Sequence, residues 1–382
     1  AGVDVLVLEK HADFLRDFRG DTIHPSTLEI LDELGLAERF LKLPHSEVSQ
    51  LVVQFPSGER IELDFRRLRT KFPFIAFVPQ WDFLRFVTTE AERYASFRLV
   101  MSADVEDLVW QGDTVTGVRY RTAEGAREVR AAVTVGADGR ASRVRQAAGL
   151  GLLLQETAPP MDVLWFRVSR RPSDANAAGL RLAPGRFFAL INRDTYWQIA
   201  YVIPKGAFET VRAQGLQAFR RSLAEGVAEL ADRADEITDW DQVKLLTVRA
   251  DRLRRWSRPG VLCIGDAAHA MSPIAGVGIN VAIQDAVETA NLLWRPLRNG
   301  RVGVRDLARV QRRREVAVRL VQAFQGLLQE RVLRPTLGQQ VPPALPLVAR
   351  VGLRLPVVRD VPARLIALGV LRPHVRAPAN VA

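Results

Sequence analysis

The spacing of apolar residues predicts alternating strands and helices over the first hundred positions. The opening AGVDVLVLEK alternates as a strand over residues 3–8. The apolar positions of HPSTLEILDELGL recur every three or four residues, which predicts a helix that ends at Gly35. Two alternating segments, SQLVVQF and RIELDF, flank the short connection PSGE and predict a hairpin. QWDFLRFVTTEAERYA then returns to helical spacing.

The later chain continues in the same manner. Three short strands and a buried strand are expected over 105–138, further strands over 161–168 and 186–203, and helix over 207–235. A final buried strand, GVLCIGD, leads through a glycine-rich segment into the long helix GINVAIQDAVETANLLWRPL, and a second, Arg-rich helix follows over about 305–331. This order predicts an α+β protein that combines a Rossmann-like α/β nucleotide-binding domain, an inserted and mostly antiparallel sheet, and C-terminal helices.

The same order suggests how the chain divides into domains. Residues 1–47, 80–158 and 250–331 are expected to form the α/β domain, and residues 48–79 and 159–249 the sheet domain that holds the substrate. The tail, 332–382, mixes apolar residues with Arg. It could pack on the core, form a dimer contact or touch a membrane surface, and its sequence leaves all three open.

Composition narrows the function classes. The chain has 382 residues, 48% of them hydrophobic, and a net charge of +11, but only 5 of its 54 basic residues are Lys and the Arg are scattered. This distribution argues against a nucleic-acid-binding stripe. The one cysteine, Cys263, cannot form an intrachain disulfide, which is typical of the cytoplasm, and no apolar run reaches the roughly 18–20 residues that span a bilayer. We therefore expect a cytoplasmic protein, with peripheral membrane contact of the tail as one alternative.

The first ten residues resemble the second strand of a dinucleotide-binding unit, since the apolar run ends in the acid Glu9. Such a strand normally follows a first strand, a glycine-rich turn and a helix. We therefore expect that the chain is N-terminally truncated. A Gly-x-Gly-x-x-Gly turn should lie roughly 10–20 residues upstream of Ala1 in the intact protein.

Two later segments carry the candidate chemistry. In TVGADGRASRVRQAAGL, Asp138 and Gly139 follow a buried strand at the sheet edge where α/β proteins bind ligands, although an Asp that only serves its own turn is the alternative. In GVLCIGDAAHAMSPIAGVGINVAIQDA, Asp266 follows a second buried strand and is placed to accept a hydrogen bond from a ligand hydroxyl. Gly276 and Gly278 lack side chains where a flat group could approach, and the next helix aims free N–H groups there.

These segments resemble a known family. IGDAAHAMSPIAGVGINVAIQDA closely resembles the third flavin motif of the FAD-dependent aromatic hydroxylases, typified by para-hydroxybenzoate hydroxylase and the ubiquinone-biosynthesis hydroxylases. VGADGRASRVR is similar to their second motif, and VLVLEKHADFLRDFRGDTIHPSTLEILDELGL to the segment after their N-terminal glycine loop. The resemblance covers roughly residues 1–330.

The resemblance implies FAD as cofactor and a role for individual residues. Glu9 would bind the adenosine ribose, Arg19 would reach the pyrophosphate and flavin edge, and Gln80 would contact the cofactor. Asp138 would serve FAD and NAD(P)H, and Asp266 the ribityl chain. The full implied set is Glu9, Lys10, Arg19, Gln80, Asp138, Gly139, Gly265, Asp266, Pro273, Gly276, Val277, Gly278, Ile279 and Asn280.

Some positions remain without a firm role. Val277 departs from the family, where Gln is common between the two glycines. His269 is interpreted as a structural neighbour of its loop rather than a base, and His24 with Pro25 as the start of a helix rather than a substrate contact. No catalytic base and no metal ligand is predicted.

The resemblance implies an NAD(P)H- and O₂-dependent monooxygenase that hydroxylates an aromatic or quinone-like small molecule through a flavin C4a-hydroperoxide. Three alternatives stay open: a flavin-dependent reductase of an isoprenoid-type substrate, a halogenase, and a truncated fragment that cannot retain FAD. A faint halogenase-like pattern lies in YWQIAYVIPKG.

Overall fold

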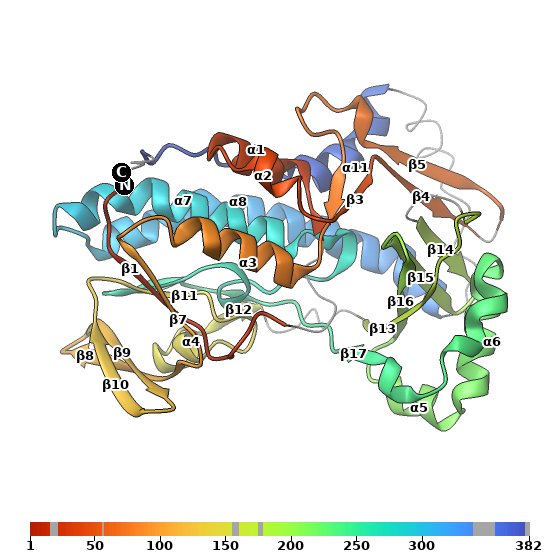
Figure 1. The fold of residues 1–382 in the computed structure, drawn as a ribbon, viewed down its shortest axis with the longest axis horizontal. Helices are drawn as coiled ribbons and strands as arrows, with labels where there is room; N and C mark the ends of the chain where they lie inside the picture. The colour runs from red at the N-terminus through yellow and green to blue at the C-terminus, as the bar shows by residue number, and fades with distance from the viewer. Residues whose placement is uncertain (16–21, 56, 155–159, 175–178, 339–355, 379–382) are drawn as a thin grey trace.

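The computed structural model describes residues 1–15, 22–55, 57–154, 160–174, 179–338 and 356–378 (Figure 1). Two long helices, α7 (Gly278–Arg298) and α8 (Val304–Leu328), pack along each other through the α/β part. A large sheet with its own helices lies at the opposite end of the molecule, to the right in Figure 1. This arrangement confirms the predicted α+β class.

The α/β part is built on short parallel strands. β1 (Val5–Leu8) pairs in parallel with β7 (Phe97–Val100), and β11 (Thr134–Gly136) with β20 (Val261–Cys263), to which β19 (Ser257–Arg258) adds an antiparallel strand. The helices packed in this part are α1 (Pro25–Glu33), α2 (Ala37–Phe40), α3 (Gln80–Ala91) and α4 (Arg143–Ala147), besides α7 and α8. The upstream strand that the sequence predicts beside β1 stays a prediction.

The predicted three-stranded excursion is confirmed. β8 (Asp104–Gln111), β9 (Thr114–Thr122) and β10 (Gly125–Arg130) form an antiparallel sheet that projects from the α/β part, at the lower left of Figure 1. A smaller sheet joins β2 (Thr22–Ile23), β6 (Ile75–Phe77) and β3 (Ser46–Val48).

The large sheet has seven strands and draws on both sequence segments that we assigned to a substrate domain. Its order is β17 (Lys244–Leu246), β13 (Met161–Ser169), β16 (Tyr196–Pro204), β15 (Arg186–Asn192), β14 (Gly179–Ala183), β4 (Gln50–Gln54) and β5 (Arg60–Asp64). All pairs are antiparallel except β14 with β4. The hairpin predicted from SQLVVQF and RIELDF is β4–β5, so that prediction is confirmed.

One face of this sheet is covered by helices. Phe166, Phe188 and Tyr201 pack there against α6 (Leu216–Gly226), with the rings of Phe188 and Tyr201 stacked at 4.4 Å. The sequence predicts one helical stretch over 207–235, but the structure divides it into α5 (Phe208–Ala213), α6 and the 3₁₀ segment η2 (Ala228–Glu236). The break before α6 is at Gly215, whose φ of +86° is outside the helical range.

The described part of the tail packs on the core. In α11 (Pro356–Leu368), Ile366 and Ala367 are buried in a cluster that includes Phe65 and Val48. Beyond it, Arg376 makes two hydrogen bonds to the carboxylate of Glu288 in α7. Packing is therefore the alternative realised by residues 356–378. In the described ranges, no helix is both long and apolar enough to cross a bilayer.

Candidate cofactor-binding site

The structure places the second and third sequence motifs side by side. β11 and β20 run in parallel with Gly136 opposite Cys263, and the N–H of Ile264 donates to the carbonyl of Gly136 at 3.0 Å. One turn later, the guanidinium of Arg145 donates to the carbonyl of Ala267 at 3.4 Å. The turns after these two strands, at Asp138 and at Asp266, therefore lie at the same edge of the sheet.

The carboxylate of Asp138 is engaged by its own turn. One oxygen accepts from the Ser142 hydroxyl at 2.5 Å and the other from the N–H of Val144 at 3.1 Å. The Ser142 hydroxyl in turn accepts from the N–H of Arg145 at 2.9 Å, which caps α4. Gly139, at φ +79°, has no atom within 4 Å of the position a Cβ would take. The geometry thus engages Asp138 in its own turn, and its role towards FAD and NAD(P)H stays a prediction.

The turn at Asp266 has a different character. Asp266 is exposed, whereas its neighbours Gly265 and Ala267 are buried. Gly265 adopts φ +57°, and a Cβ there would lie 3.0 Å from the Cβ of Ala282 on α7. Glycine is required at this position by both the backbone and the close approach of the helix.

A buried ionic network behind this turn was missed by the sequence analysis. The carboxylate of Asp285 on α7 accepts from the N–H of Gly265 at 3.1 Å, from Nε2 of His269 at 2.6 Å and from Nε of Arg314 on α8 at 2.8 Å. The side chains of Asp285, His269 and Arg314 are at most 1% exposed. Burial favours the neutral acid, but the charges and hydrogen bonds of His269 and Arg314 outweigh it and hold the pKa of Asp285 below its usual value.

A signal for this network exists in the sequence. Asp285 lies on the buried face of α7, one turn after Val281, and Arg314 lies on the buried face of α8 between Val310 and Ala317. A charged residue at an apolar-face position of a predicted helix needs a partner. The spacing along the chain does not show that Asp285 pairs with Arg314, because α7 and α8 come together only when the chain folds.

The glycine-rich loop before α7 contains two consecutive left-handed residues. Ala275 has φ +64° and Gly276 has φ +62°. A Cβ on Gly276 would lie 2.6 Å from the hydroxyl oxygen of Thr22, and that hydroxyl donates to the Gly276 carbonyl at 2.9 Å. At Gly278, by contrast, the nearest atom to a Cβ is 3.8 Å away, on Met271. Gly276 is therefore closely packed by the protein, and Gly278 is open.

Asn280 fastens this loop to the start of α1. Its side-chain oxygen accepts from the N–H of His24 at 2.9 Å and from the Thr27 hydroxyl at 2.7 Å, and its amide donates to the carbonyl of Thr22 at 2.9 Å. The side chain of Asn280 is 3% exposed. Its polar atoms are thus used within the protein.

His24 is fully buried at the N-cap of α1, but its side chain does not cap the helix. Its Nδ1 lies 2.7 Å from the carbonyl oxygen of Ile366 on α11. Because a carbonyl only accepts, Nδ1 carries the proton. Burial lowers the pKa of His24 to about 4, although the bond to Ile366 opposes this shift, so the ring is neutral near pH 7.

The remaining predicted residues lie at several places. Glu9 follows β1 and is partly buried, with its carboxylate accepting from the N–H of His11 at 2.9 Å, and Lys10 is exposed. Gln80 begins α3 and is partly buried. Arg19 lies outside the described residues. The other three positions belong to the loop and the start of α7: Pro273, Val277 and Ile279.

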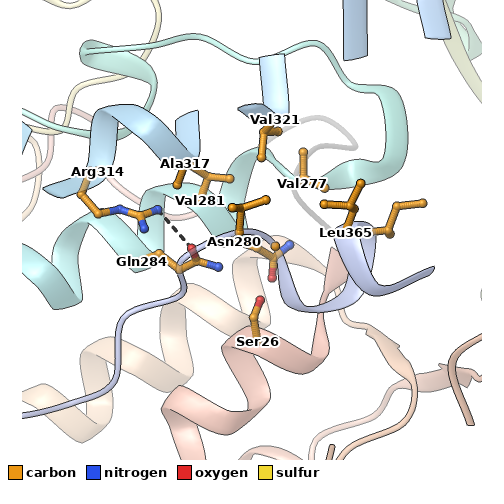
Figure 2. A pocket seen from close by; sticks show the side chains of 12 residues that line it. Ser26, Val277, Asn280, Val281, Gln284, Arg314, Ala317, Val321 and Leu365 are labelled. Atoms are coloured by element: carbon orange, nitrogen blue, oxygen red, sulfur yellow. Dashed lines mark hydrogen bonds between the residues drawn. The ribbon is translucent and has the colours of Figure 1, made fainter. Parts of the chain in front are cut away.

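A small cavity lies behind the start of α7, where α7, α8 and α11 meet (Figure 2). Figure 2 shows Gln284 and Arg314 facing each other across a hydrogen bond of 3.0 Å, with Asn280 and Ser26 at the other end of the cavity. Arg314, which belongs to the buried network of Asp285, and Asn280 both line this cavity.

The arrangement fits a dinucleotide cofactor of the flavin type. Gly139 leaves the backbone open at the sheet edge and Gly278 leaves it open at the start of α7, and Asp266 is the exposed residue of an otherwise buried turn. The N-terminus of α7, a helix of 21 residues, has no side-chain cap from the part of the chain that the structure describes. Its first N–H groups are available to a negatively charged ligand. In the same described ranges, no cluster of His, Cys, Asp and Glu could hold a metal ion.

Comparisons with known proteins point to one family. Residues 1–324 match the family model described as FAD binding domain. The chain is 30% identical to 6-methylpretetramide 4-monooxygenase of Streptomyces rimosus, over 97% of this chain and 87% of that protein. It is 27% identical to rifampicin monooxygenase of Streptomyces venezuelae over 77% of this chain, but spans 59% of that longer protein.

Solved structures share the fold. PqsL of Pseudomonas aeruginosa in complex with 2-aminobenzoylacetate superposes with a TM-score of 0.75 at 22% identity, covering 88% of this chain and 92% of PqsL. The myxobacterial halogenase CndH also gives 0.75, at 18% identity, over 100% of this chain and 89% of CndH. At these identities the likeness shows the fold alone. The family model and the Streptomyces rimosus relative carry the assignment: the chain belongs to the FAD binding domain family of flavin-dependent aromatic monooxygenases, and FAD is its cofactor.

Proposed function

We propose that this protein, with FAD bound, uses NADH or NADPH and O₂ to hydroxylate a polycyclic aromatic small molecule. The observation that carries the proposal is the 30% identity to 6-methylpretetramide 4-monooxygenase over nearly the whole chain. The bound flavin would supply the redox chemistry and the activation of oxygen. The protein would bind and orient the ring, exclude water and stabilise charge.

The residues that would hold FAD are those of the sheet edge and the loop. Asp266 would accept hydrogen bonds from cofactor hydroxyl groups, and the open backbone at Gly278 would let a flat ring approach. The first N–H groups of α7 carry partial positive charge, which would stabilise negative charge on the ring. Glu9 would bind the ribose at the end of β1.

The substrate would lie against the second face of the seven-stranded sheet. Met161, Val163 and Ala200 on that face are buried in one cluster, and Ile274 of the glycine-rich loop packs against it. Trp165, on the same face, has a buried Nε1 with no hydrogen-bond partner among the described residues. An apolar wall beside the loop, with one indole donor, suits an aromatic ring that carries an oxygen substituent.

The test is oxygen incorporation. The purified protein, reconstituted with FAD, would be supplied with NADPH, ¹⁸O₂ and a panel of polycyclic phenols, and products would be analysed by mass spectrometry. We expect one labelled oxygen atom in the product for each NADPH consumed. A reduced product without label would instead support the reductase alternative, and NADPH consumption that yields only hydrogen peroxide with every phenol would contradict the proposed substrate class.

A further inference from the structure

We infer that Asp285 is a positioning residue: it holds the turn from Gly265 to His269 in the conformation that presents Asp266 to the cofactor. The inference rests on the proposed FAD site. It adds a residue outside the predicted set, which acts through the turn without touching the ligand itself.

The contacts anchor the turn at both of its ends. A single oxygen, Oδ2 of Asp285, accepts from the backbone N–H of Gly265 at 3.1 Å and from Nε2 of His269 at 2.6 Å. Asp266 lies between these two anchored residues and is exposed, whereas Gly265 and His269 are buried. The turn is thus fixed from behind while its one exposed carboxylate faces outward.

The second oxygen of Asp285 is held by a different helix. Oδ1 accepts from Nε of Arg314 at 2.8 Å, and another nitrogen of Arg314 donates to the side-chain oxygen of Gln284 at 3.0 Å (Figure 2). Arg314 therefore fixes the orientation of the Asp285 carboxylate towards the turn. Because the network is fully buried, water cannot replace a lost partner.

The test uses Asp285→Asn, which keeps the shape of the side chain but leaves only one acceptor oxygen. If that oxygen faces Arg314, the new amide opposes the N–H of Gly265; if it faces the turn, the amide opposes Arg314. In both cases two donors meet. We expect hydrogen exchange of the amides from Gly265 to His269 to become about tenfold faster, and FAD to bind about tenfold more weakly.

A second substitution should reverse the defect. In Asp285→Asn/Arg314→Gln, the oxygen of the introduced asparagine can face the turn while its amide donates to the introduced glutamine. We expect exchange in the turn and the affinity for FAD to return to within about threefold of the wild-type values. Exchange in the turn is compared with exchange in the rest of the protein, because a role limited to general stability would raise and restore exchange throughout the chain.

The matched control is Asp174→Asn in the other part of the molecule, where Asp174 accepts from Arg233 and from the Trp197 indole at 2.9 Å. It removes a comparable ion pair and should leave exchange from Gly265 to His269 unchanged. Wild-type exchange in Asp285→Asn, or a double variant as defective as the single one, would overturn the inference. If exchange follows the expected pattern but the wild-type protein binds no FAD, the anchoring of the turn by Asp285 stands, whereas its role towards the cofactor and the proposed function both fail.

Discussion

The turns at Asp138 and Asp266 follow neighbouring parallel strands and look alike in sequence, yet they are anchored by different carboxylates. Asp138 accepts from the Ser142 hydroxyl and the Val144 N–H, so both of its oxygens stabilise the start of α4. The turn at Asp266 is instead anchored by a carboxylate from another element, Asp285 on α7.

The difference suggests which of the two acids the protein itself needs to hold its turn. A turn that is stabilised by its own aspartate has a complete set of local hydrogen bonds, and that aspartate is no longer needed elsewhere. A turn anchored from behind by a buried residue relies on that residue for its conformation. We therefore expect the two acids to differ in their effects on FAD binding and on stability.

The largest effect should come from Asp266→Ala. A carboxylate that accepts two hydrogen bonds from ligand hydroxyl groups contributes about 4 kcal/mol, so FAD should bind about 1000-fold more weakly. The free energy of unfolding of the apoprotein should hardly change, because the side chain is exposed. Flavin fluorescence titration and urea unfolding would measure the two quantities. Unchanged affinity for FAD would remove the proposed role of Asp266.

Acid should lower the stability of the fold through His24, whose ring is buried against Ile366 of α11 and whose backbone N–H donates to Asn280 at the start of α7. The pKa of His24 is about 4 in the fold against 6.5 for the free side chain, so the unfolded chain binds a proton between these values that the native state excludes. Stability is therefore complete above pH 6.5 and falls as the pH drops towards 4, by about 3 kcal/mol in total.

The variant His24→Gln isolates this contribution. Its amide can still donate to the carbonyl of Ile366 but does not titrate, so urea unfolding at pH 7 and pH 4.5 should differ less than in the wild type. An equal loss of stability in both proteins would show that His24 is not the group that responds.

The sequence predicted most of the fold because periodicity states which face of an element is buried. The hairpin β4–β5 and the helices α7 and α8 follow directly from that pattern. The tail could not be assigned, since an apolar face does not say what covers it. Likewise, the break of the helical stretch at Gly215 depends on a backbone conformation that glycine permits but does not require.

For the site, the motifs located the acids and glycines, but their uses were decided by residues distant in sequence. The motif alone assigns Asn280 to FAD. In the structure, the side-chain amide of Asn280 is hydrogen-bonded to Thr22 and to the start of α1. The anchor of the Asp266 turn joins α7 to α8. Such pairs arise only when the helices pack, so spacing along the chain cannot predict them.

The two loop glycines should separate a requirement of the fold from one of the ligand. Gly276→Ala forces a side chain to φ +62° and within 2.6 Å of the Thr22 hydroxyl, which should lower the free energy of unfolding by about 2 kcal/mol. Gly278→Ala meets nothing closer than 3.8 Å, so stability should be kept while FAD binds about tenfold more weakly. Urea unfolding and flavin titration of both variants would measure the two effects. A loss of stability in Gly278→Ala, or a loss of FAD affinity without a loss of stability in Gly276→Ala, would contradict this assignment.

The smallest effect is expected from Asp138→Ala, and this variant tests directly whether Asp138 and Asp266 have different roles. Loss of the acceptor for the Val144 N–H and the Ser142 hydroxyl resembles loss of a helix N-cap, which costs about 1 kcal/mol. FAD should bind within about threefold of the wild type, because both oxygens of Asp138 already have partners in the fold. Urea unfolding and flavin titration on one sample give both numbers. Should FAD binding weaken tenfold or more while stability is unchanged, Asp138 would serve the ligand as Asp266 does, and the two turns would differ only in how they are anchored.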